Sequence, residues 1–126
     1  LYGSGGGDRL DGGPGADWIN AAPGADFADG GVGRDFVTGG SGADTLFGGD
    51  GADELYGGAD DDVMGGGMGG DRLSAQRGDD TAYGEDGDDL LDGGEGRNGL
   101  FGGNGRDGCR PGAAVYRCEG SGPRID

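Results

Sequence analysis

The amino-acid sequence predicts an all-β fold: a parallel β-roll, or β-solenoid, with two facing sheets of short strands and 18 residues in each coil. Three observations support this prediction: a period of nine residues, a cluster of glycines early in each unit, and one apolar residue near its end. One unit provides a turn and a single inward side chain, which cannot form a core alone, so successive coils must stack. We predict the roll to cover residues 1–110 and residues 111–126 to form a carboxyl-terminal cap or tail.

The unit Gly39–Phe47, GGSGADTLF, shows the pattern most clearly. Glycine fills its first, second and fourth slots, aspartate its sixth and leucine its eighth. The first six residues have the composition of a tight turn, and the last three predict a very short strand whose middle side chain points inward. The eighth slot is apolar or cysteine in every unit, at Leu1, Leu10, Ile19, Ala28, Val37, Leu46, Leu55, Met64, Leu73, Ala82, Leu91, Leu100 and Cys109.

Other glycine-rich structures fit the pattern less well. Acidic, glycine-rich sequence is often a disordered linker, because it buries too little apolar surface to offset the cost of ordering. Three slots that stay in phase over twelve units argue against a linker. Collagen has a period of three, and glycine at this density disfavours a helix.

The sixth slot carries the residues with the clearest chemistry. It holds aspartate in eleven of twelve units, at Asp8, Asp17, Asp26, Asp35, Asp44, Asp53, Asp62, Asp71, Asp80, Asp89 and Asp107, and Asn98 in the other. Alternate units fall on opposite edges of the roll, so aspartates on one edge lie about 4.8 Å apart and repel each other unless a cation lies between them. Carboxylates beside glycine carbonyls suit a hard cation, and calcium better than magnesium.

Composition excludes several classes of function. The formal net charge of −16 argues against nucleic acid and anionic membranes as partners. No apolar run approaches the roughly 18 residues that span a bilayer. The sequence has no histidine, which excludes a Ser-His-Asp triad and most zinc sites. We therefore do not expect this chain to be an enzyme.

The pattern GGxGxDxUx, with U a large apolar residue, resembles the calcium-binding nonapeptide of RTX (haemolysin-type) repeat proteins. The resemblance covers residues 1 to about 110. It implies calcium between successive turns on each edge, with the sixth-slot aspartates as ligands and about 8–10 ions in total. It also implies a secreted bacterial protein that stays unfolded until it meets calcium outside the cell. Glycine carbonyls of the first, second and fourth slots would complete the sites, among them those of Gly30, Gly33, Gly39, Gly42, Gly48, Gly51, Gly66 and Gly69.

Departures from the pattern predict weaker sites. Ala21-Ala22 and Ala75-Gln76 replace glycine pairs, so we expect strained or reshaped turns there. Asp60 stands where a glycine with positive φ is expected, although aspartate tolerates that conformation better than most residues. Asn98 keeps an oxygen ligand but loses its charge. We expect reduced calcium occupancy beside Asn98 and around Ala75-Gln76.

The carboxyl end contains both cysteines, Cys109 and Cys118. They lie nine residues apart, so they could face each other across the last coil, and we favour a disulfide over two buried thiols in an extracellular protein. Because the sequence begins at Leu1, we expect a processed product or a fragment.

The outward strand positions include several aromatic side chains. Trp18 and Phe36 lie on one sheet and offer a surface for a protein partner; the simpler explanation is that aromatic residues favour strands. The preferred function is a calcium-binding structural module. The alternatives are an adhesive or partner-binding module, and the carboxyl-terminal part of a larger secreted enzyme or toxin.

Overall fold

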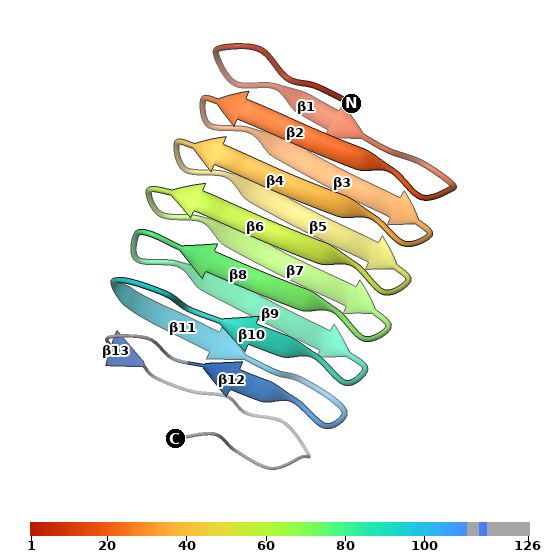
Figure 1. The fold of residues 1–126 in the computed structure, drawn as a ribbon, viewed down its shortest axis with the longest axis vertical. Helices are drawn as coiled ribbons and strands as arrows, with labels where there is room; N and C mark the ends of the chain where they lie inside the picture. The colour runs from red at the N-terminus through yellow and green to blue at the C-terminus, as the bar shows by residue number, and fades with distance from the viewer. Residues whose placement is uncertain (111–113, 116–126) are drawn as a thin grey trace.

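The computed structural model describes residues 1–110 and 114–115, and these form strands and turns without a helix (Figure 1). The strands on one face of the roll are β2 (Trp18–Pro23), β4 (Phe36–Ser41), β6 (Glu54–Ala59), β8 (Arg72–Gln76), β10 (Leu90–Asp92) and β12 (Gly108–Arg110). Those on the other face are β1 (Arg9–Asp11), β3 (Phe27–Val32), β5 (Thr45–Asp50), β7 (Val63–Met68), β9 (Thr81–Asp86), β11 (Arg97–Phe101) and β13 (Ala114–Val115).

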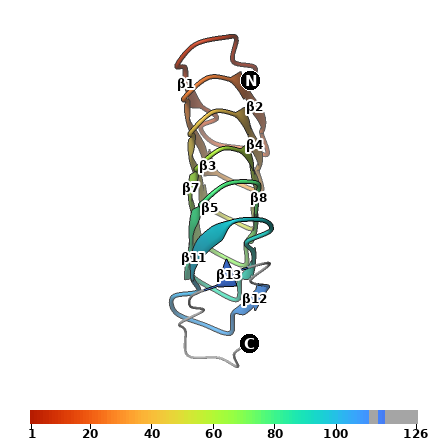
Figure 2. The ribbon, with the colours of Figure 1, turned by 90° about the vertical axis from the view of Figure 1, so that its left-hand side faces the viewer.

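The strands form two parallel sheets that face each other. One sheet has the order β12-β10-β8-β6-β4-β2 and the other the order β1-β3-β5-β7-β9-β11-β13. Each strand pairs with the strand one coil away, as in the registers Phe27↔Thr45 and Leu46↔Met64, which are 18 residues apart. Figure 2 shows successive coils stacked along the long axis of the molecule, with the two sheets on opposite sides. The predicted parallel β-roll is confirmed.

The strands are longer than the three residues that the sequence pattern predicts. A typical strand, such as β5, has six residues and continues through the glycine pair into the third slot of the next unit. The turn is therefore confined to the fourth, fifth and sixth slots. Glycine pairs can extend the strand because they pair with each other across coils, as Gly31 does with Gly49 and Gly40 with Gly58. Without a Cβ, the stacked backbones can approach closely.

The eighth-slot side chains form one continuous core between the two sheets. Every member from Ile19 to Cys109 is buried, and Leu10 packs partly against the cluster. At Ala28 and Ala82 the core is less well filled, because an alanine side chain contributes little apolar volume. Leu1 occupies the same slot but is 56% exposed.

The predicted cap falls almost wholly outside the described residues. Of residues 111–126, the structure describes only the short strand β13, which pairs with β11. Cys109 is buried, and Cys118 lies outside the described residues. The boundary near residue 110 and the Cys109–Cys118 disulfide stay predictions.

Candidate metal sites

The sixth-slot side chains form two columns, one along each edge of the roll. Each turn directs its aspartate toward the interior, and all sixth-slot residues from Asp26 to Asp107 are buried. One carboxylate oxygen, Oδ1, accepts a hydrogen bond from the backbone N–H of the sixth-slot residue one coil earlier. The Asp26 N–H lies 2.9 Å from Asp44 Oδ1, and the Asp44 N–H lies 2.8 Å from Asp62 Oδ1. These bonds fix the carboxylates from Asp26 to Asp107 in the same orientation.

The second carboxylate oxygen, Oδ2, has no such partner. In the described part of the chain, ten buried Oδ2 atoms lack a hydrogen bond. They belong to Asp17, Asp26, Asp35, Asp44, Asp53, Asp62, Asp71, Asp80, Asp89 and Asp107. Buried polar atoms are nearly always bonded, so a regular series of exceptions indicates a ligand. Asp8, in the first coil, differs because its Oδ2 accepts the Ser4 N–H at 2.8 Å.

The contacts of Asn98 indicate which groups lie near the Oδ2 position of the sixth slot. Its Nδ2 atom lies 2.8 Å from the carbonyl oxygen of Gly93 and 3.3 Å from that of Glu95. These are the first-slot and third-slot carbonyls of its own unit. In the aspartate units, the corresponding side-chain atom is an oxygen, Oδ2, which has no hydrogen-bond partner. An ionised Oδ2 has no proton to donate to a carbonyl oxygen, so a cation is the partner that suits such an oxygen cluster.

The first slot brings in an oxygen from a second coil. A Cβ placed on Gly30 would lie 2.6 Å from Asp35 Oδ2 and 2.7 Å from the Gly48 carbonyl oxygen. A carboxylate oxygen and a carbonyl oxygen of the next coil therefore converge on the same glycine. This convergence explains the glycine preference at this slot and places oxygens of two coils close together.

The predicted glycine ligands lie beside these columns. Gly30, Gly39, Gly48 and Gly66 occupy first slots, and Gly33, Gly42, Gly51 and Gly69 occupy fourth slots in the turns. Their roles as carbonyl ligands stay predictions. The third-slot carbonyl, which Asn98 contacts at Glu95, is absent from the sequence prediction. Side chains vary at that slot, and a backbone carbonyl leaves no trace in the residue type.

The donor set contains only oxygen. Among residues 1–110, no three histidine, cysteine, aspartate or glutamate side chains cluster as a metal site. Each candidate site instead combines few carboxylates with several backbone carbonyls. Such a set fits a hard cation and provides no ligand for a soft metal.

Burial changes the acidity of the stacked carboxylates. It raises the pKa of Asp62, Asp71 and Asp89 to about 7, and that of Asp44 and Asp80 to about 6. Hydrogen bonds from backbone N–H groups oppose this rise, whereas the negative charges of neighbouring aspartates add to it. In the absence of a cation, Asp62, Asp71 and Asp89 are therefore partly protonated near neutral pH in the folded roll.

The raised pKa values predict that protonation of the buried aspartates partly stabilises the fold when calcium is absent. The pKa of Asp62 lies near 7 in the folded chain and at the ordinary value of 3.8 in the unfolded chain. The folded form therefore binds more protons between these values, and its stability falls as the pH rises through that window. In a chelator, lowering the pH from about 8 to about 5 should increase the β-sheet signal in circular dichroism.

Paired variants separate this effect from a general loss of charge. Asp62→Asn with Asp71→Asn removes two buried carboxylates and should weaken the pH response, which Asp44, Asp80 and Asp89 still support. Asp11→Asn with Glu54→Gln removes two carboxylates that lie outside the buried columns and should leave the response unchanged. A β-sheet signal that stays constant or declines on acidification contradicts the prediction.

The turns that depart from the pattern keep the common conformation. Positive φ occurs at Ala22 (76°), Asp60 (80°) and Gln76 (77°), so these turns are strained rather than reshaped. Asp60 also uses its side chain, which accepts the Gly42 N–H at 3.0 Å. A fourth case, Glu85 (φ 73°), also replaces the second glycine of a pair, and the sequence prediction missed it.

Comparison with known families agrees with this geometry. The model of the RTX calcium-binding nonapeptide repeat matches in four copies, at residues 2–37, 38–73, 65–100 and 74–109. The chain belongs to this family. RTX repeats form calcium-binding β-rolls, which are structural repeats rather than catalytic folds. No curated protein sequence matches the chain significantly.

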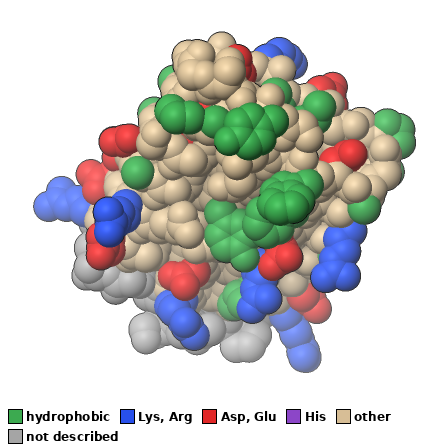
Figure 3. Space-filling model, turned by 45° about the horizontal axis from the view of Figure 1, so that its top comes forward, with side chains coloured by type: hydrophobic (Ala, Val, Ile, Leu, Met, Phe, Trp, Pro, Cys, Tyr) green, Lys and Arg blue, Asp and Glu red, His purple; other side chains and the backbone are tan. Residues whose placement is uncertain are grey.

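The outward aromatic side chains of this RTX roll pack against each other. Trp18 is 70% exposed, and its ring meets Phe36 edge to face at 5.8 Å between centroids. Phe36 contacts Tyr56 at 5.2 Å. Figure 3 shows hydrophobic side chains in separate patches, with charged side chains mostly toward the margins of the face. Cross-strand packing accounts for the rings, and a protein partner stays a prediction.

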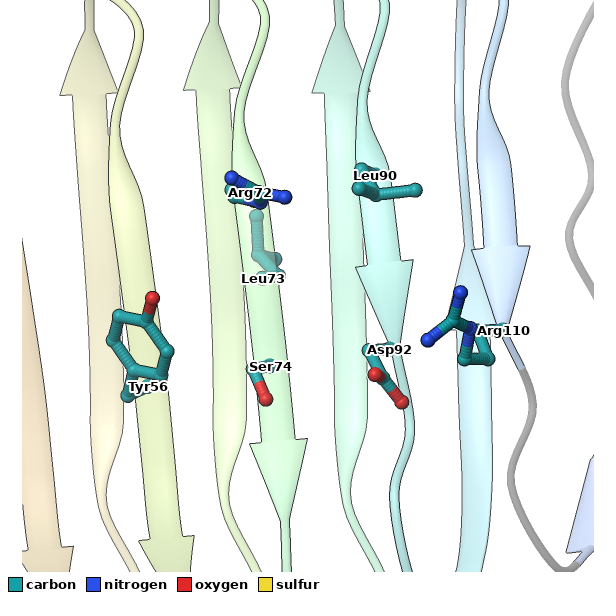
Figure 4. A pocket seen from close by; sticks show the side chains of 7 residues that line it. All are labelled: Tyr56, Arg72, Leu73, Ser74, Leu90, Asp92 and Arg110. Carbon is teal, nitrogen blue, oxygen red and sulfur yellow. The ribbon is translucent and has the colours of Figure 1, made fainter.

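A pocket lies on the sheet that contains β6, β8, β10 and β12. It is lined by Tyr56, Arg72, Leu73, Ser74, Leu90, Asp92 and Arg110. Figure 4 shows their side chains spread over neighbouring strands rather than converging on one point. We assign no chemistry to this pocket.

Within the described residues, no helix has the length and hydrophobicity needed to cross a membrane.

Proposed function

We propose that this chain is a structural module of a secreted bacterial protein that binds several calcium ions and folds as it binds them. The observation that carries the proposal is the series of ten buried Oδ2 atoms without a hydrogen-bond partner. Their regular spacing along both edges favours repeated cation sites over a single one.

The residues of two coils would share each ion. The sixth-slot aspartate supplies Oδ2, and carbonyl oxygens of the turns supply neutral ligands, including the first-slot and third-slot oxygens that Asn98 contacts in its own unit. Calcium would supply positive charge between stacked carboxylates and join one coil to the next. About 8–10 dications would carry roughly +16 to +20 and so offset all of the formal charge of −16.

Coupling between binding and folding follows from the thin core. Each coil contributes only two inward eighth-slot side chains, and in two coils one of these is alanine, at Ala28 and Ala82. Glycine supplies 38 of the 126 residues and raises the entropy cost of ordering the chain. Sites that exist only in the folded form convert binding energy into folding energy.

Secretion fits this chemistry. Extracellular calcium modules bind with dissociation constants of about 0.1–1 mM, which suits ions held by few charged ligands. A Cys109–Cys118 disulfide would fit the same compartment.

Calorimetric titration of the chain with calcium chloride tests the proposal. We expect about 8–10 ions per chain, because each pair of stacked turns shares one site. Magnesium chloride is the control and should give much weaker binding, since magnesium prefers a tighter octahedron and retains its water. Fewer than about four calcium ions per chain would contradict repeated sites along both edges.

A further inference from the structure

Asn98 occupies the same place in the roll as the ligand aspartates. It lies in β11, it is fully buried, and its Oδ1 accepts the Asp80 N–H at 2.8 Å. The equivalent bond between Asp62 and Asp80 Oδ1 is 2.7 Å. The first side-chain oxygen of Asn98 is therefore bonded as in the aspartate turns, although β10 ends before the glycine pair and β11 begins at Arg97.

The second side-chain atom differs in kind. Nδ2 donates to the Gly93 carbonyl at 2.8 Å and lies 3.3 Å from the Glu95 carbonyl. Only this orientation of the amide satisfies all three contacts. The opposite orientation would set oxygen against two carbonyl oxygens and an N–H group against the Asp80 N–H.

We propose that the turn at residues 93–98 binds no calcium, because the Asn98 amide group takes the place of the ion. The inference rests on the proposed function and adds a determinant of site number to it. The two amide protons carry positive partial charge toward the carbonyls that a cation would otherwise hold. The neutral amide brings no negative charge that requires compensation. This assignment replaces the expectation, drawn from sequence, that Asn98 ligates calcium at reduced occupancy.

The two edges of the roll are therefore unequal. The edge from Asp17 to Asp107 carries an unpartnered Oδ2 in every coil. On the other edge, the sixth-slot side chains of the first and last turns have partners within the chain. Asp8 Oδ2 accepts the Ser4 N–H, and Asn98 Nδ2 donates to the Gly93 carbonyl. An aspartate-to-asparagine exchange at the sixth slot accordingly acts as a switch between a cation-dependent and a cation-independent turn.

Exchanging the residues in both directions tests the inference. Asn98→Asp should raise the calorimetric calcium stoichiometry by one, and Asp62→Asn should lower it by one while the β-sheet signal in calcium is retained. Asp11→Asn, on the exposed surface of β1 and outside the turns, should leave the stoichiometry unchanged. Unchanged stoichiometry in folded Asn98→Asp would overturn the inference. So would an Asp62→Asn chain that no longer folds in calcium, because the amide then fails to replace the ion.

A second measurement distinguishes this inference from the proposed function. In the folded chain, the side-chain NH₂ protons of Asn98 should exchange with solvent at least about tenfold more slowly than those of exposed Asn104. Exchange at the rate of Asn104 would overturn the inference. If the wild-type chain binds no calcium, the proposed function fails, and the exchange rate of Asn98 still decides whether its amide holds the turn.

Discussion

Replacing Gly42 with valine is expected to prevent two neighbouring coils from stacking. Gly42 has a φ of +114°, which a β-branched residue adopts only under strain. A Cβ at this position would also overlap the carbonyl oxygen of Gly24 in the preceding coil. That oxygen belongs to the backbone of a paired turn and cannot rotate away. The cost should be about 3 kcal/mol or more, which is a large part of the stability of a small domain.

The expected result is a loss of calcium-induced β-sheet signal and a lower calcium stoichiometry. Each coil contacts only its neighbours, so an interruption at Gly42 separates the coils before it from those after it. Ser41→Val is the matched control, because Ser41 is exposed, lies next to Gly42 and has no positive φ. A Gly42→Val chain with the melting temperature and stoichiometry of the control would contradict the steric argument.

The architecture could be predicted from the sequence because the repeat has no insertions. The eighth-slot column from Ile19 to Cys109 is buried as expected, and the register of 18 residues follows directly from two units per coil. The predicted strand length of three residues was wrong, because a typical strand such as β5 has six residues. Glycine is rare in strand interiors, and the pattern does not show that Gly40 pairs with Gly58.

The metal sites were predicted less completely than the fold. The sequence identifies the aspartates, because a carboxylate is visible as a residue type. It does not show which carboxylate oxygen is already bonded, or that the Glu95 carbonyl contacts the sixth-slot side chain. It also does not show the hydrogen bonds of Asn98, which depend on the backbone conformation of the whole turn.

Removing calcium should have a larger effect than any single substitution. An unsatisfied buried polar group costs about 1–3 kcal/mol, and more when it is charged. The structure buries ten such carboxylate oxygens, so their combined cost exceeds the entire stability of a typical domain. Protonation relieves only part of this cost at neutral pH, since the highest of these pKa values are about 7. The calcium-free chain is therefore expected to be unfolded.

Far-ultraviolet circular dichroism, recorded near pH 7.5 before and after calcium is added to a chelated sample, tests the central claim most directly. We expect the spectrum of a disordered chain in the chelator and a β-sheet spectrum in millimolar calcium. The same concentration of magnesium should produce little change. A full β-sheet spectrum in the chelator, unchanged by calcium, would contradict the claim that the buried aspartate columns require calcium to fold.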